Sequence, residues 1–158
     1  MMISFSDAKT LILMGQSLLK GAAKEKNLER RKRIISTLKI IYFEDSTISL
    51  IRQTRSKTRV ESDEAARLLQ LKLLDGRYQV DRSLTILRDE GVDFSLTLKQ
   101  RRLFDLICFG KVHVRQELFR IIDGADADVF EATLASIEKL NSEIEELEEK
   151  FHEGLELR

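Results

Sequence analysis

The chain contains no proline among its 158 residues. Average usage near 5% would give roughly eight. Because proline fixes φ and lacks a backbone donor, it commonly marks turns, strand edges and helix boundaries. Its absence is typical of helices joined by short turns of glycine, serine, aspartate and asparagine. A chain of this length can bury a hydrophobic core as one unit, and we expect a single all-α domain over residues 1–158.

The densest apolar run extends from Leu103 to Ile122. On a helical period its apolar residues form one broad stripe, and the first half of the run is apolar on nearly every side. We expect such a helix at the centre of the molecule. Gly110 lies on the stripe and costs a helix about 1 kcal/mol relative to alanine. A continuous or kinked helix is the favoured interpretation; in the alternative, the helix stops at Gly110 and a second element begins at Lys111.

Apolar spacing and capping residues predict further helices on both sides of this run. Asn27 and Thr97 are suitable N-caps, and Gly91 suits the position that follows a helix. Gly76 either ends or bends the helix in which it lies. The result is a bundle of five or six helices, with a bundle body over 1–122. The segments expected to be helical are 4–26, 27–43, 62–91, 97–122 and, after a turn at 123–126, the rest of 123–158. In residues 47–59 the pattern predicts a short helix followed by a frayed end or a mobile loop.

The last segment, residues 123–158, has the pattern of an acidic, coiled-coil-like helix. Its apolar residues recur at the a and d positions of about three heptads, with glutamates outside them. Asp128 and Glu131 have the spacing of an N-terminal capping pair. The narrow apolar seam is covered by the bundle itself, by another copy of the chain or by a different protein. The candidate protein-interaction residues are Phe130, Ile137, Leu140, Ile144, Leu147 and Phe151.

Formal charge sums to zero but is divided unevenly along the chain. Residues 1–60 hold 13 Lys and Arg against 5 Asp and Glu, whereas residues 123–158 hold 3 against 12. Residues 61–122 are nearly neutral, with 11 basic and 10 acidic side chains. The two ends can therefore attract each other, within one chain or between chains, or each can meet an outside partner of opposite charge.

The basic half supports an alternative, a regulator that binds nucleic acid by neutralising phosphates. Two observations count against it. Aromatic residues do not interleave with the basic ones, as they do in single-strand binders. A helix-turn-helix placed on 117–130 would present Asp126, Asp128 and Glu131 to DNA. The candidate residues of this alternative are Lys24, Lys26, Arg30, Arg31, Lys32, Arg33, Arg52, Arg55, Lys57 and Arg59.

The two histidines and one cysteine offer little for catalysis or metal binding. Glu149 and His152 have the Glu-x-x-His spacing of di-iron bundles, but that site needs a second pair. The second pair would need a glutamate three residues before His113, and that position is Gly110. No glycine-rich phosphate loop is present, and Cys108 has no basic neighbour suited to lowering its pKa. We expect no catalytic residue, no metal, no cofactor and no enzymatic activity.

The remaining features concern location and function. No segment approaches the roughly 18 apolar residues of a membrane span, and Asp7 precedes an apolar run too short for a signal peptide. A single cysteine excludes an internal disulfide. We therefore expect a soluble cytoplasmic protein without membrane contact. Its predicted function is a non-enzymatic interaction or assembly subunit that binds itself, as a homo-oligomer, or a partner protein through helical surfaces; nucleic-acid binding is the alternative.

Overall fold

The structure is a computed structural model that describes the backbone of residues 5–55, 58–74, 77–92 and 94–156, with side chains except at 5–7, 77–81 and 152–156. Within these residues all regular structure is helical, which confirms the all-α prediction. The expected number of five or six helices is not confirmed, because the described residues are divided among α1 to α8. The helices are α1 (Phe5–Lys24), α2 (Leu28–Ile41), α3 (Asp45–Gln53), α4 (Arg59–Leu74), α5 (Arg77–Asp89), α6 (Leu98–Cys108), α7 (Val114–Asp123) and α8 (Ala127–Glu156).

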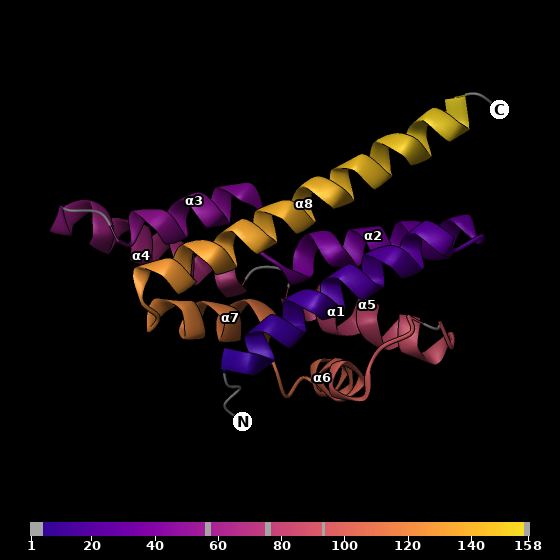
Figure 1. Ribbon diagram of the computed structural model, residues 1–158, viewed down its shortest axis with the longest axis horizontal. Coiled ribbons are helices and arrows are strands. Elements are labelled where there is room, and N and C mark those ends of the chain that lie inside the picture. Colours follow the sequence, from indigo (N-terminus) through magenta and orange to yellow (C-terminus); the bar gives the residue numbers. More distant parts are fainter. Residues whose placement is uncertain (1–4, 56–57, 75–76, 93, 157–158) are drawn as a thin grey trace.

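The helices pack around the antiparallel pair α1 and α2 (Figure 1). The long helix α8 crosses this pair on one side, where it contacts α1, α2, α3 and α7. Helices α5 and α6 lie on the other side, with α5 against α2 and α6 against α1. Helices α3 and α4 contact each other and form the end of the molecule opposite the turn between α1 and α2 (Figure 1).

Helix α1 occupies the central position that the sequence suggested for residues 103–122. It contacts α2, α6, α7 and α8. Gly15 makes the approach of α8 possible, because a Cβ at this position would lie 2.9 Å from both the Leu140 side chain and the Tyr42 ring. The expectation for 103–122 is wrong because the run is split between α6 and α7, which pack separately against α1. The buried residues of α1 are Ala8, Leu11, Ile12, Met14, Gly15, Leu18 and Ala22.

The split occurs at Gly110, where the favoured interpretation of a continuous helix is wrong. Gly110 has a φ of 69°, a left-handed conformation that favours glycine. Its amide donates to the Ile107 carbonyl at 3.0 Å, and the Lys111 amide donates to the Leu106 carbonyl at 2.8 Å. These two bonds form a Schellman motif that ends α6. Gly91 ends α5 in the same way, with a φ of 72°, as predicted. The prediction for Gly76 lies outside the described residues.

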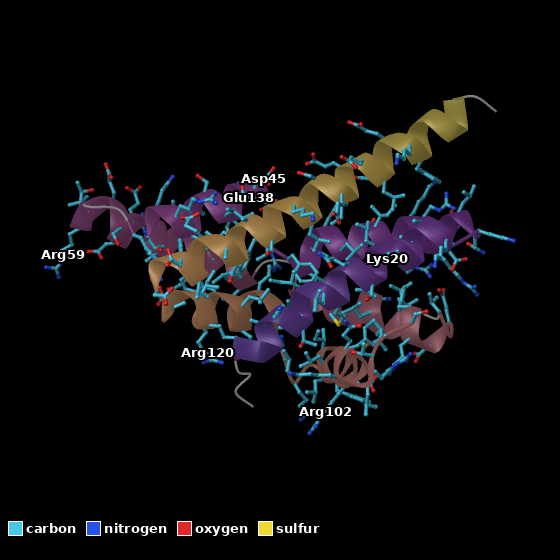
Figure 2. All side chains as sticks on the ribbon, viewed as in Figure 1. Lys20, Asp45, Arg59, Arg102, Arg120 and Glu138 are labelled. Atoms are coloured by element: carbon cyan, nitrogen blue, oxygen red, sulfur yellow. The ribbon has the colours of Figure 1, made fainter. Side chains whose placement is uncertain are left out.

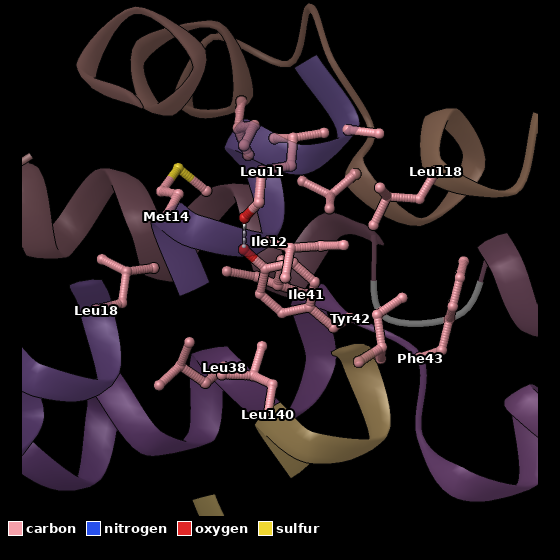
Figure 3. Close-up of a cluster of buried hydrophobic side chains, with 14 of the residues drawn as sticks. Leu11, Ile12, Met14, Leu18, Leu38, Ile41, Tyr42, Phe43, Leu118 and Leu140 are labelled. Carbon is pink, nitrogen blue, oxygen red and sulfur yellow. Dashed lines mark hydrogen bonds between the residues drawn. The ribbon is translucent and has the colours of Figure 1, made fainter. Parts of the chain in front are cut away.

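One cluster of buried apolar side chains connects all the helices. Figure 3 shows its centre, where residues of α1 and α2 meet Leu118 of α7 and Leu140 of α8. The Tyr42 hydroxyl is fully buried there and donates to the Leu11 carbonyl. Burial raises the pKa of this hydroxyl, so it stays a neutral donor. The hydrogen bond satisfies two polar atoms that have no access to water.

Candidate interaction surfaces

The apolar seam of α8 packs largely inside the chain's own core. Phe130, Ile137, Leu140 and Ile144 are buried, whereas Leu147 and Phe151 are partly buried. The rest of the bundle therefore covers the first four residues of the seam, which was one of the three possibilities for this surface. Association of the seam with another protein remains a prediction. It would have to involve the last turns of α8, where Leu147 and Phe151 are partly exposed.

Glutamates of α8 also form ion pairs with basic residues of the N-terminal half of the chain. The Arg52 guanidinium of α3 lies 2.6 Å from Glu138 and 3.3 Å from Glu131, both on α8. The hydrogen bond that Arg52 donates to Glu138 raises the pKa of Arg52. Lys39 of α2 lies 2.7 Å from Glu148. The opposite charges of the two chain ends therefore meet, in part, within one molecule.

Arg55 fixes the turn between α7 and α8. Its guanidinium donates to the carbonyls of Ile122, Asp123 and Ala125 at 3.0 to 3.2 Å. The same group lies 3.8 Å from the centre of the Phe130 ring, a cation–π contact. The amino terminus of α8 is capped by Asp126, whose carboxylate accepts from the Val129 amide at 3.0 Å. The proposed capping pair at Asp128 is therefore wrong by two positions.

The basic residues of the nucleic-acid alternative do not form one surface. Residues 24–33 lie around the turn between α1 and α2, whereas Arg52, Arg55 and Arg59 lie at the opposite end of the molecule. Figure 2 shows the separation, with Arg59 at one extremity and Lys20 on the far half of α1. Lys57 lies outside the described residues.

Several of these side chains are occupied within the chain. Arg30 and Arg33 pair with Glu90, and the Arg31 guanidinium binds the Glu25 carbonyl and lies 5.6 Å from the centre of the Phe151 ring. Arg59 has a long contact of 3.9 Å with Asp63, and both side chains are exposed. Within the described part of the chain, Lys24, Lys26 and Lys32 are exposed and form no ion pair.

Among the described residues, α4 carries more exposed large apolar side chains than any other helix, and it also buries apolar side chains on its opposite side. Ala65, Leu69 and Leu73 are buried on the inner face. The outer face carries four exposed side chains: Val60 at 78%, Leu68 at 41%, Leu71 at 67% and Leu74 at 51% of their full exposure. We call these four residues the α4 outer face.

The sequence pattern of residues 68–74, a crowded apolar surface of five leucines, did not separate the two faces of this helix. Five leucines in seven positions cannot share one helical face, because a helix turns 100° per residue. The position of α4 decides which ones remain exposed: it contacts α3 and α7 and lies at the end of the bundle. The signal in the sequence was an apolar run wider than one stripe.

The described residues also form open hollows with mixed polar and apolar linings. One, of about 340 Å³, lies between α2, the turn after it and α8, and is lined by Lys39, Glu44, Asp45, Ser46, Asn141, Ile144 and Glu145. Another, of about 330 Å³, is lined by Ser17, Lys20, Gly21, Lys24, Glu25, Phe94 and Ser95. Neither lining contains a histidine or cysteine.

The structure describes the side chains of two of the three candidates for chemistry, Cys108 and His113. His113 is the N-cap residue of α7, and its Nδ1 is buried. The side chain of His152 lies outside the described residues, and Cys108 is half-buried. Among the described residues, no group of three or more His, Cys, Asp or Glu is arranged to hold a metal ion.

The described helices include none that combines the length and apolar character needed to cross a membrane. Comparison with known proteins gives no family assignment: no protein-family model, no curated protein and no solved structure matches the chain.

Proposed function

We propose that this chain is a non-enzymatic assembly subunit that binds protein, including copies of itself, through the α4 outer face. The observation that carries this proposal is the alignment of Val60, Leu68, Leu71 and Leu74 along one side of a single helix. Leu68, Leu71 and Leu74 are neighbours at i, i+3 spacing. Contiguous apolar surface of this kind is typical of protein interfaces, whereas single exposed apolar residues are common and need no explanation.

The other exposed large apolar residues do not form such a row. Leu13, Leu28, Ile86 and Leu98 each belong to a different helix, and Phe109 follows α6. The Phe109 ring is partly covered by the Arg88 guanidinium, 4.8 Å from its centre. Only the α4 outer face, among the described residues, presents several exposed apolar side chains on one element.

The nucleic-acid alternative has less support, because its basic residues are divided between two ends and many are paired within the chain. A cytoplasmic location belongs to the proposal as well, on the ground that the single Cys108 forms no internal disulfide. Self-association makes the protein a homo-oligomer, with α4 rather than the buried part of the α8 seam as its contact.

The test is light scattering after size-exclusion chromatography, over a range of protein concentrations and at low and high salt. Leu71→Glu places a charge in the middle of the α4 outer face without touching the core. Leu98→Glu is the matched control, because Leu98 is 88% exposed on α6 and isolated from the other apolar residues. Circular dichroism verifies that both variants remain folded.

The proposal predicts an oligomer in the wild type and in Leu98→Glu, and a monomer in Leu71→Glu. High salt should leave the oligomer in place, because apolar contact is not screened. A wild-type chain that stays monomeric at every concentration would contradict the proposal. A monomer whose absorbance ratio at 260 and 280 nm reveals bound nucleic acid at low salt would favour the alternative.

A further inference from the structure

We infer that the partner of the α4 outer face is a second copy of this chain, bound so that the two α4 helices run antiparallel, with Glu64 of each copy paired to Arg67 of the other. This inference rests on the proposed function and adds the occupant, the orientation and the register. Its basis is the charge pattern within the exposed face.

The exposed positions of α4 follow a heptad spacing. Val60, Glu64, Arg67, Leu71 and Leu74 are separated by four, three, four and three residues, so they form one line along the helix. All five are exposed. Neither Glu64 nor Arg67 forms an ion pair with another described residue, so both charges are available to a partner.

In one antiparallel register, the charged and apolar residues of this line face matching residues of the same line in a second copy. When the midpoint between residues 65 and 66 lies on the twofold axis, residue n faces residue 131 − n of the other copy. Glu64 then faces Arg67, and Val60 faces Leu71, and the twofold axis repeats both pairs. Two apolar layers of Val60 and Leu71 therefore enclose two ion pairs, whereas Leu68 faces Asp63 and Leu74 lies beyond the end of the facing α4.

Other arrangements of the same two helices lose this complementarity. In a parallel pair, Glu64 faces Glu64 and Arg67 faces Arg67, which brings like charges together. An antiparallel pair shifted by one heptad sets Glu64 against Leu74 and Arg67 against Leu71, so both charges are covered without partners. Charged residues inside a helical seam thus specify one orientation and one register.

The size of the contact sets the expected strength. In this register residues 59–72 of the two α4 helices overlap, which gives a seam about 21 Å long. A contact of one helix per copy lies at the lower end of the sizes found for specific interfaces. The dimer should therefore dissociate on dilution, which makes it measurable by sedimentation.

The experiment uses two charge-reversal variants of the full chain, Glu64→Arg and Arg67→Glu. Each variant alone creates two repulsive contacts in the dimer, and self-association should weaken by about tenfold or more. An equimolar mixture of the two restores both attractive pairs, because one copy then contributes only positive and the other only negative side chains. Arg102→Glu and Glu146→Arg are matched controls that reverse exposed charges on α6 and α8 (Figure 2 labels Arg102).

Sedimentation velocity with a fluorescent label on one variant gives the outcome. A mixed dimer, at concentrations at which each variant alone is monomeric, is the expected result. Unchanged dimers of the single variants, or a mixture that stays monomeric, would overturn the antiparallel pairing. A wild-type oligomer that Leu71→Glu disrupts but the charge reversals do not would overturn this inference alone, whereas a monomeric wild type would overturn the proposed function too.

Discussion

The seam of α8 and the line of Val60, Glu64, Arg67, Leu71 and Leu74 on α4 have the same heptad spacing and opposite surroundings. On α8, the first four apolar positions face α1, α2, α3 and α7, and they are buried. On α4, the line of Val60, Leu71 and Leu74 faces away from the bundle. Heptad spacing therefore shows which residues share a helical face, whereas the position of the helix in the bundle decides whether that face is covered.

Replacing one leucine by alanine in each region should give the largest difference in the free energy of unfolding between α8 and α4. Leu140→Ala leaves a cavity between α8 and α1 and should lower the free energy of unfolding by about 2 to 5 kcal/mol. Leu71→Ala should change the stability of the monomer by no more than about 0.5 kcal/mol. Urea denaturation at low protein concentration measures both. Equal losses in the two variants would mean that the two faces do not differ in burial.

The contact between α1 and α8 can be tested from the other side by Gly15→Ala. The added Cβ would lie 2.9 Å from Leu140 and Tyr42, both buried, so overpacking should exceed the gain in helix propensity. We expect a net loss of about 1 to 2 kcal/mol in the free energy of unfolding.

Gly124→Ala is the control, because its nearest atom would be a backbone oxygen at 4.0 Å and its φ is −87°. That variant should be neutral or slightly stabilised. If Gly15→Ala gave the same result as Gly124→Ala, α8 would not lie as close to α1 as the structure describes.

Arg55 connects α3 to the start of α8, and its removal should loosen that end of the seam. Arg55→Ala loses three hydrogen bonds to carbonyls and the contact with the Phe130 ring. Because the guanidinium is partly in solvent, we expect a loss of about 1 kcal/mol by thermal or urea unfolding. Arg59→Ala removes a neighbouring arginine of 95% exposure and should have no measurable effect. Equal effects of the two would contradict this assignment.

The smallest predicted effect concerns the ion pair between Lys72 of α4 and Glu44, and it depends on pH. The hydrogen bond from Lys72 lowers the pKa of Glu44 below its ordinary value. A depressed pKa means that the charged form stabilises the fold at neutral pH and that this contribution is lost as the pH falls through the folded-state value.

Glu44→Gln should therefore reduce the acid sensitivity of stability below about pH 4.5, by less than about 0.5 kcal/mol because the pair is exposed. Glu146→Gln, on the exposed side of α8, is the control. A larger change in the control than in Glu44→Gln would show that this ion pair does not hold α4 to the turn before α3.

Local signals in the sequence identified much of the secondary structure. The Asn27 side chain accepts from the Arg30 amide, and Thr97 forms a capping box with Gln100, so both predicted caps are confirmed. The helix predicted to start at Ser62 begins three residues earlier, at Arg59. Gly110 was ambiguous because a glycine in an apolar stripe fits both a close helix contact and a helix end.

Contacts between helices could not be predicted in the same way, because they depend on residues far apart in the chain. The pairing of Arg52 with Glu138 joins residues separated by 86 positions, and Arg55 binds carbonyls almost 70 positions away. The charge division predicted that opposite ends could meet but not which residues do so. The α4 outer face was missed for the same reason, since its exposure follows from the place of α4 at the end of the bundle.

Hydrogen–deuterium exchange measured at several protein concentrations compares the two regions in one experiment. If α4 meets a second copy and α8 is covered by its own chain, amides of residues 60–74 should exchange more slowly as concentration rises, while those of residues 130–144 should not change. Protection of 130–144 that rises with concentration, with constant exchange in 60–74, would contradict this and would place the contact between copies on α8.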